Sequence, residues 1–131
     1  MILADTDVLI DYLAGVQPVA EQVAAYAKAD RLQTSAITCF ELLSGARDGK
    51  PGDGIRRLVS ALPTLSLDRS AATQAAAVRQ QCARGGFSIG MADSLIAGIA
   101  LEHGLPLLTR NRKHFEHVEG LRLLPLDQVV D

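Results

Sequence analysis

The chain has 131 residues, of which 48% are hydrophobic and 21% charged, and its formal net charge is -2 at pH 7. This length suits one domain with one core, so we expect a single domain over residues 1–131. The charge excludes the overall positive field by which many nucleic-acid-binding proteins attract their ligand, and an aromatic content of 4% leaves few residues for base stacking.

Membrane and disulfide signals are both weak in this sequence. It contains no run of about 18 apolar residues that would span a bilayer, and Asp5 interrupts the apolar start before a signal peptide can form. Cys39 and Cys82 stand apart, without a CxxC pair, which favours small buried hydrophobes over a disulfide or a zinc site. We therefore expect a cytoplasmic protein.

Strand and helix signals alternate in the first half of the chain. In chain order they predict a strand at 2–4, a helix over about 8–14, a helix over 18–28, a strand at 32–37 and a helix from residue 38. Thr38 and Glu41 have the spacing of a capping box at the start of that last helix. The turn formers at 47–54 predict a surface loop.

The second half of the chain continues the alternation. It predicts helices at 55–61, 69–84 and 93–103, strands at 64–67 and 105–109, and a last strand at 121–124. Parallel strands need crossover connections, and both faces of their sheet must be covered. The fold class is therefore α/β, a three-layer αβα domain with a mostly parallel sheet of four or five strands.

Acidic residues follow the predicted strands. Asp5 comes directly after the first strand, Glu41 follows the second, and Asp93 lies in the first turn of a later helix. Ligands of such sheets bind beyond the carboxyl ends of the strands, and clustered carboxylates suit a hard cation such as Mg²⁺ or Mn²⁺. Each acid taken alone is equally well explained as a helix cap or as a charge favoured by the helix dipole.

Four stretches together resemble the motifs of the PIN-domain family, and they span residues 2 to about 124. The stretches are Leu3-Ala4-Asp5-Thr6-Asp7-Val8-Leu9-Ile10-Asp11; Ser35-Ala36-Ile37-Thr38 with Glu41-Leu42 and Gly45; Ala92-Asp93-Ser94-Leu95-Ile96-Ala97; and Leu108-Thr109-Arg110-Asn111 with His114-Phe115 and Gly120-Leu121. The small size is similar to that of the VapC toxins, which cut RNA with Mg²⁺ or Mn²⁺ and are silenced by a cognate antitoxin.

The resemblance implies roles for particular residues. Asp5, Glu41 and Asp93 match the three acidic positions of the family, with Asp5 and Asp93 as direct metal ligands and Glu41 completing the shell or orienting water. Asn111 matches a fourth position that is acidic in many members, and an amide there leaves a second metal open. Asp7 is either an additional ligand or, as we favour, a polar residue at the helix start. Thr109 is a further accessory candidate.

Positive charge follows the strand at 105–109. Arg110, Arg112 and Lys113 are candidates for binding RNA phosphates, and a solvated helix face explains them equally well. None of the three histidines has a metal-ligand spacing with the acids, so none is assigned as a ligand: His103, His114 and His117.

The resemblance also implies partners. These are an RNA substrate, a VapB-type antitoxin, a second copy of the chain, and DNA only indirectly through the antitoxin. The antitoxin would occupy an apolar groove beside the active site, although core packing accounts equally well for most candidate residues. They are Leu9, Leu13, Val19, Val23, Leu42, Leu43 and Leu58.

Two other functions fit parts of the sequence. Asp5 and Asp7 after a strand also resemble the first motif of haloacid-dehalogenase-type phosphatases, but that family needs a suitably placed lysine and a later acidic pair. The only lysines are Lys28, Lys50 and Lys113, and Asp93 has no acidic neighbour. A non-catalytic module that acts only through its partner is the second alternative, and it would not require the acidic positions.

Overall fold

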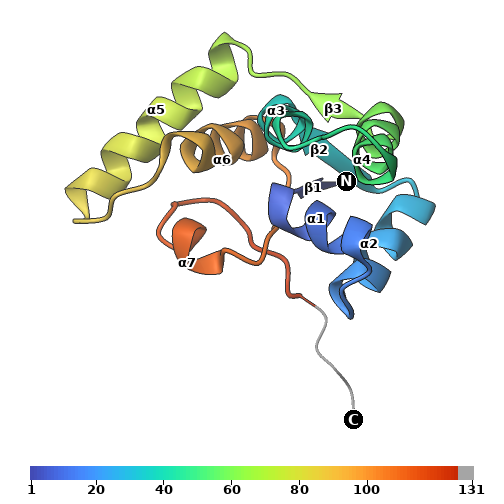
Figure 1. Cartoon of the computed structure of the whole chain (residues 1–131). Helices are drawn as coiled ribbons and strands as arrows, with labels where there is room; N and C mark the ends of the chain where they lie inside the picture. Colours follow the sequence, from blue (N-terminus) through green and yellow to red (C-terminus); the bar gives the residue numbers. More distant parts are fainter. Residues whose placement is uncertain (127–131) are drawn as a thin grey trace.

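The computed structural model describes residues 1–126 and shows a sheet between two layers of helices (Figure 1). Four parallel strands form the sheet in the order β3-β2-β1-β4. Their bounds are β1 Ile2–Ala4, β2 Leu32–Ser35, β3 Thr64–Leu65 and β4 Leu107–Leu108. The predicted αβα architecture and parallel sheet are confirmed, and the last five residues of the expected domain lie outside the described residues.

Seven helices lie within residues 1–126. They are α1 Thr6–Ala14, α2 Val19–Lys28, α3 Ala36–Ser44, α4 Lys50–Ala61, α5 Arg69–Arg84, α6 Met91–His103 and α7 Arg112–Phe115. The long helix α5 has the predicted bounds, because Asp68 caps its first turn by accepting the backbone N–H of Ala71. None of the described helices is long and apolar enough to cross a bilayer.

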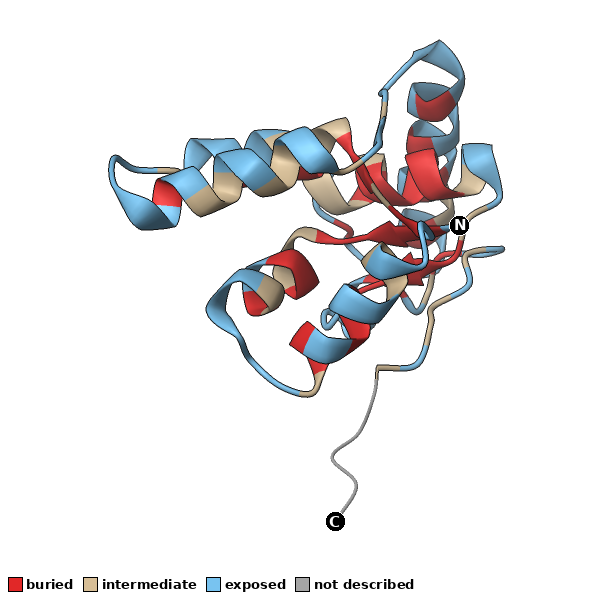
Figure 2. Cartoon of the chain, turned by 90° about the vertical axis from the view of Figure 1, so that its right-hand side faces the viewer, coloured by how far each residue is buried: buried red, intermediate tan, exposed pale blue. Residues whose placement is uncertain are grey.

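The two faces of the sheet carry two separate hydrophobic clusters. Neighbouring residues of a strand point to opposite faces, so Ile2 and Ala4 pack with α1 and α2, whereas Leu3 packs with α5 and α6. Figure 2 shows this burial on the strands and on the inward sides of the helices. The sheet is covered on both faces, as a parallel sheet requires.

Helices α5 and α6 pack closely because Gly98 has no side chain. A Cβ at Gly98 would lie 2.6 Å from the carbonyl oxygen of Ala71 and 2.7 Å from Cβ of Ala75. Real Cβ atoms do not approach so closely, so any larger residue must push the helices apart. This close approach makes α5 and α6 one tightly packed pair of helices.

The start of α3 differs from its prediction. Strand β2 ends at Ser35 rather than Ile37, because the Ser35 hydroxyl accepts the backbone N–H of Thr38 at 3.1 Å and caps the helix. The predicted capping box of Thr38 and Glu41 is therefore wrong. Glu41 lies in the second turn of α3 and not in its first.

The expected loop at 47–54 is mostly the start of α4. Pro51 suits the first turn of a helix, where its missing N–H costs no hydrogen bond. Gly52 is needed there, since a Cβ would lie 1.6 Å from the carbonyl oxygen of Arg47. The turn-forming residues thus mark a helix start instead of an irregular connection.

The remaining differences concern element ends. The strands predicted at 64–67 and 105–109 are each two residues long, and the last predicted strand is reduced to one parallel bridge between Leu123 and Leu107. Helix α6 begins at Met91 rather than at Asp93. Cys82 is buried as expected, whereas Cys39 is only half-buried, its sulfur 3.5 Å from the Thr64 hydroxyl.

The strand order places a topological switch point between β1 and β4. The chain builds β1, β2 and β3 outward in one direction and then returns to add β4 on the other side of β1. Crossover connections leave such a point on opposite faces, which opens a crevice beyond the carboxyl ends of the two strands. Asp5 follows β1 at this crevice, and Thr109 follows β4.

Candidate active site

Asp5 lies at the switch point with both carboxylate oxygens engaged. The Thr109 hydroxyl donates to Oδ2 at 2.7 Å, and the backbone N–H of Thr6 donates to Oδ1 at 2.8 Å. The backbone N–H of Asp5 donates to the carbonyl of Leu108 at 2.9 Å. Asp5 is only 4% exposed, so the ends of β1 and β4 hold its carboxylate in a fixed position.

Burial makes the charge on Asp5 costly. Desolvation raises the pKa of its carboxyl from 3.8 to about 6, and the hydrogen bond from Thr109 opposes this rise. The charges of Asp7 and Asp93 raise the pKa of Asp5 further. A cation placed among them would relieve both the burial and the repulsion.

Asp7 joins the start of α1 to the segment after β4. Its Oδ2 accepts the backbone N–H of Arg110 at 3.0 Å and lies 3.4 Å from the Thr109 hydroxyl. Its Oδ1 is buried and has no hydrogen-bond partner among the described residues. Desolvation by burial raises the pKa of Asp7 as well, while the Arg110 amide and charge oppose this rise.

A second acid of α1 holds the side chain of Arg110. Arg110 Nε lies 2.7 Å from Oδ2 of Asp11, whose side chain is only 8% exposed. This contact is an ion pair without hydrogen-bond alignment, since the same oxygen has no hydrogen-bond partner within the described residues. The binding of phosphate by Arg110 stays a prediction: its Nε is paired with α1, and its side chain is 51% exposed.

Glu41 is linked to Asp5 through Thr6. The Thr6 hydroxyl donates to Oε1 of Glu41 at 2.7 Å and lies 3.1 Å from the hydroxyl of buried Thr38. The backbone of the same Thr6 binds Asp5. The structure therefore brings α3 to the rim where β1 ends and sets the Glu41 carboxylate beside that rim.

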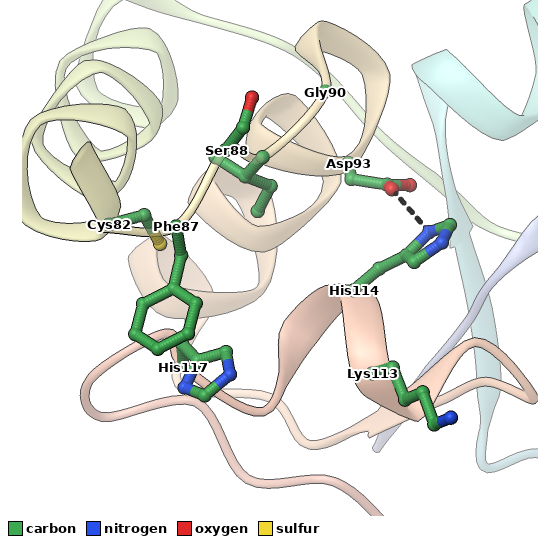
Figure 3. A pocket seen from close by; sticks show the side chains of 9 residues that line it. Cys82, Phe87, Ser88, Gly90, Asp93, Lys113, His114 and His117 are labelled. Carbon is green, nitrogen blue, oxygen red and sulfur yellow. Dashed lines mark hydrogen bonds and ion pairs between the residues drawn. The ribbon is translucent and has the colours of Figure 1, made fainter. Parts of the chain in front are cut away.

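Asp93 reaches the site from the opposite side, in the first turn of α6. Its Oδ2 lies 2.9 Å from Nδ1 of His114 on α7, and Figure 3 shows the two side chains pointing toward each other at one side of a pocket. The Asp93 side chain is 23% exposed and His114 is 58% exposed. Asp93 is thus held less firmly than Asp5, by one solvent-exposed contact.

The remaining predicted residues lie around α7. Asn111 precedes α7, and its backbone N–H donates to the Thr109 hydroxyl at 3.0 Å. Because the same hydroxyl donates to Asp5, Thr109 links Asn111 to Asp5. Arg112 donates to the Leu124 carbonyl at 2.8 Å, which fixes its guanidinium to the backbone. Lys113 lines the pocket beside Asp93 and makes no ion pair within residues 1–126.

Sequence and structure comparisons agree on one family. A family model described as "PIN domain" matches residues 2–121. The tRNA(fMet)-specific endonuclease VapC of Shigella flexneri is 37% identical over 92 residues, which cover 67% of this chain and 70% of that protein. Ribonuclease VapC10 of Mycobacterium tuberculosis (strain CDC 1551 / Oshkosh) is 31% identical over 122 residues, which cover 93% of this chain and 91% of that protein. The chain belongs to the PIN-domain family, among its VapC ribonucleases.

A solved structure supports the same conclusion for the fold. The DNA-bound VapBC complex from Salmonella typhimurium contains a chain that is 28% identical, with a TM-score of 0.78 over 95% of this chain and 98% of that chain. The family resemblance seen in the sequence and the predicted ribonuclease toxin class are confirmed. The phosphatase alternative is wrong, because Asp5 and Asp7 belong to the first motif of a PIN domain.

The oxygen donors of this PIN domain fit a hard divalent cation in kind. Asp5, Asp7 and Asp93 repel one another electrostatically, and Oδ1 of Asp7 is buried without a hydrogen-bond partner. In residues 1–126, however, no three His, Cys, Asp or Glu side chains are gathered in a group that could hold a metal ion. Glu41 is bonded to Thr6 and Asp93 to His114, so a cation would have to draw these two side chains inward.

The sequence did not predict the roles of two residues of this PIN domain. Thr6 joins Asp5 to Glu41, and His114 holds Asp93. Thr6 carried a signal, since it lies between two acids at a strand end. His114 did not, because its contact with Asp93 spans 21 positions and depends on how α6 and α7 pack.

Proposed function

We propose that the chain hydrolyses RNA phosphodiesters in the cytoplasm with one Mg²⁺ or Mn²⁺ ion bound by Asp5 and Asp93, as the toxin of a VapBC-type pair. One observation carries the metal site: Asp5 is buried at the switch point, and desolvation, with smaller contributions from the charges of Asp7 and Asp93, raises its pKa to about 6. The bound cation supplies neutralisation of the phosphodiester charge and a water of lowered pKa.

Each residue contributes through the contact it already makes. Thr109 orients the Asp5 carboxylate, and Asn111 in turn holds the Thr109 hydroxyl. Glu41, fixed by Thr6, is placed to complete the metal shell or to accept a proton from the attacking water. His114 keeps Asp93 at the pocket rim until the cation binds. The amide of Asn111 adds no charge, which favours one tightly bound metal over two.

The antitoxin is a partner by analogy with the VapBC complex from Salmonella typhimurium. Of the predicted groove residues, Leu9, Val19, Val23 and Leu42 are buried in the core, so they do not form a groove. Leu13 is 38% exposed and lines a pocket of about 510 Å³ with Ile10, Pro51 and Ile55. Lys50 and Arg57 border this pocket. We place an apolar antitoxin segment there, between α1 and α4.

The decisive experiment is cleavage of total cellular RNA with mapped ends. The purified protein is incubated with RNA in the presence of Mg²⁺, Mn²⁺ or a chelator, next to Asp5→Asn and a surface control, Arg79→Ala. Metal-dependent cleavage at defined positions by the wild type and the control, but not by Asp5→Asn, supports the proposal. Cleavage that persists in chelator or in purified Asp5→Asn protein refutes the metal site.

A further inference from the structure

A pocket of about 310 Å³ opens beside Asp93, and the carboxylate chemistry does not use it. Its walls come from two segments, the loop between α5 and α6 and the short helix α7 with the residues after it (Figure 3). Asp93, His114 and Lys113 form one side, and Phe87, Ser88 and His117 form the other. This volume lies at the lower end of the range for small-molecule sites and accommodates one nucleobase.

The second side of the pocket is a flat aromatic surface. The rings of Phe87 and His117 are stacked with centroids 3.4 Å apart and planes inclined by 12°. Phe87 is nonetheless 43% exposed, which is costly for a side chain of this size unless something covers it. Proteins that bind single-stranded nucleic acids stack an unpaired base on the exposed face of an aromatic ring.

The surrounding contacts keep this surface in place. The backbone N–H of Phe87 donates to the Cys82 carbonyl at 2.9 Å. The Phe87 ring packs closely over Gly85, where an added Cβ would lie 3.2 Å from Cδ2 of the ring. The Gln81 side chain of α5 donates to the His117 carbonyl and accepts the backbone N–H of Glu119. Both rings are therefore anchored to the end of α5 and need no rearrangement to receive a base.

The charge at the pocket is uneven in a way that suits a nucleotide. Arg110 and Arg112, the other two predicted phosphate ligands, are engaged with Asp11 and the Leu124 carbonyl. Within residues 1–126, Lys113 is the cation of this set whose side chain has neither an ion pair nor a hydrogen bond, and it lines the pocket. Lys113 and Asp93 lie on the same side of the pocket, so a phosphate bound by Lys113 would lie on the side of the carboxylates.

We propose that this pocket binds the base of the nucleotide next to the phosphodiester that is cut, with the free face of the Phe87 ring, backed by the stacked His117 ring, as its stacking surface and Lys113 binding its phosphate. This inference rests on the proposed ribonuclease function. It makes Phe87 a determinant of which nucleotide is accepted, separate from the carboxylates that act on the phosphodiester.

The first test uses an RNA oligonucleotide that contains one mapped cleavage site. In a series of substrates, each nucleotide near the site is replaced by an abasic one, and kcat/KM is measured for wild type, Phe87→Ala, Phe87→Tyr and the matched control Phe40→Ala. We expect one flanking abasic position and Phe87→Ala each to lower kcat/KM by about tenfold, mainly through KM. Phe87→Tyr should keep most of the activity, and Phe40→Ala all of it.

The combination of both changes decides the matter. If the base stacks on Phe87, the abasic substrate costs Phe87→Ala nothing further, because the contact is already lost. Equal activity of Phe87→Ala and wild type, or additive losses in the combination, would overturn the proposal while leaving the ribonuclease function intact.

A second measurement does not depend on cleavage. The four ribonucleoside 5′-monophosphates are titrated separately into metal-free protein, and backbone amide shifts are followed by NMR. At least one nucleotide should shift residues 87–90 and 113–117 in the wild type and not in Phe87→Ala. If the wild type cuts no RNA, the proposed function fails while these shifts still test the pocket. The absence of shifts with all four nucleotides would refute the nucleotide site.

Discussion

The two sides of the site hold their acids in different ways. Asp5 is 4% exposed and is bound from β1, β4 and α1, whereas the Asp93 side chain is 23% exposed and meets His114, itself 58% exposed. Strand ends position the first carboxylate, and two helices joined by loops position the second. One half of the site is therefore fixed before any ligand binds, and the other half is free to adjust.

This difference explains how the site can lack a ready metal cage and still be built for a cation. In the fixed half, burial makes the charged form of two neighbouring carboxylates costly, and it raises the pKa of both Asp5 and Asp7. The adjustable half supplies a carboxylate that a weak, exposed contact retains. A cation would gain the attraction of the first half and pull in the second.

The largest expected effect is the loss of cleavage in Asp5→Asn and in Asp93→Asn. In the proposed mechanism each change removes a charged metal ligand, so the rate of RNA cleavage at saturating metal should fall by more than about 100-fold. Both proteins should remain folded by circular dichroism. An Asp93→Asn protein that cleaves RNA at the wild-type rate would show that the adjustable half is not part of the metal site.

The same contrast governs what the sequence could reveal. Asp5 was predictable because a carboxylate directly after a buried strand can lie only at the edge of the sheet. Glu41 was assigned to the right helix and the wrong turn, since Thr38 offered a capping pattern that Ser35 took over. Neighbours in sequence compete for one cap, and only the backbone geometry decides between them.

Contacts between distant elements were beyond the sequence. The Asp93–His114 contact depends on the packing of α6 against α7. The Arg110–Asp11 pair looked like free positive charge, because nothing local to Arg110 shows that α1 passes beside it. The strand order was equally hidden, since strands of two residues leave almost no periodic signal.

The next effect breaks the fixed half itself. Arg110→Ala should lower the free energy of unfolding by about 2 kcal/mol, because it leaves the buried Asp11 carboxylate without its cation. The matched control is Arg56→Ala, whose pair with Asp53 is exposed on both sides and should matter little. Urea unfolding measures both. Replacing Asp11 by Asn in the Arg110→Ala protein should recover part of the loss, and no recovery would contradict the ion-pair explanation.

A smaller effect loosens the adjustable half. His114→Ala removes the only hydrogen bond that the described structure gives the Asp93 side chain, and metal affinity should weaken by about tenfold through poorer orientation of the carboxylate. His114→Asn keeps a donor near the same place and should restore part of the affinity. Calorimetric titration with Mn²⁺ provides the measurement. Unchanged affinity in His114→Ala would show that His114 does not position Asp93.

The smallest effect separates the two halves by pH. The pKa of Asp5 is raised from 3.8 to about 6, so the folded protein binds this proton more tightly than the unfolded chain does. Stability from this group is therefore present below about pH 4 and is lost as the pH rises toward 6 and above. In chelator, Asp5→Asn escapes that loss and should be more stable than the wild type at pH 7.5, by about 1 kcal/mol after the weaker bond to Thr109 is allowed for.

At pH 4 the advantage of Asp5→Asn should vanish. Asp93→Asn keeps Asp5, so its stability should keep most of the wild-type pH dependence. Thermal unfolding at both pH values, with and without Mg²⁺, tests this. Magnesium should stabilise the wild type at pH 7.5 and leave Asp5→Asn unchanged, because only a charged Asp5 attracts the cation. If Asp5→Asn were instead less stable than the wild type at pH 7.5 without metal, the carboxylate would be stabilising the fold. The buried Asp5 carboxylate would then serve to stabilise the fold and not to bind a cation.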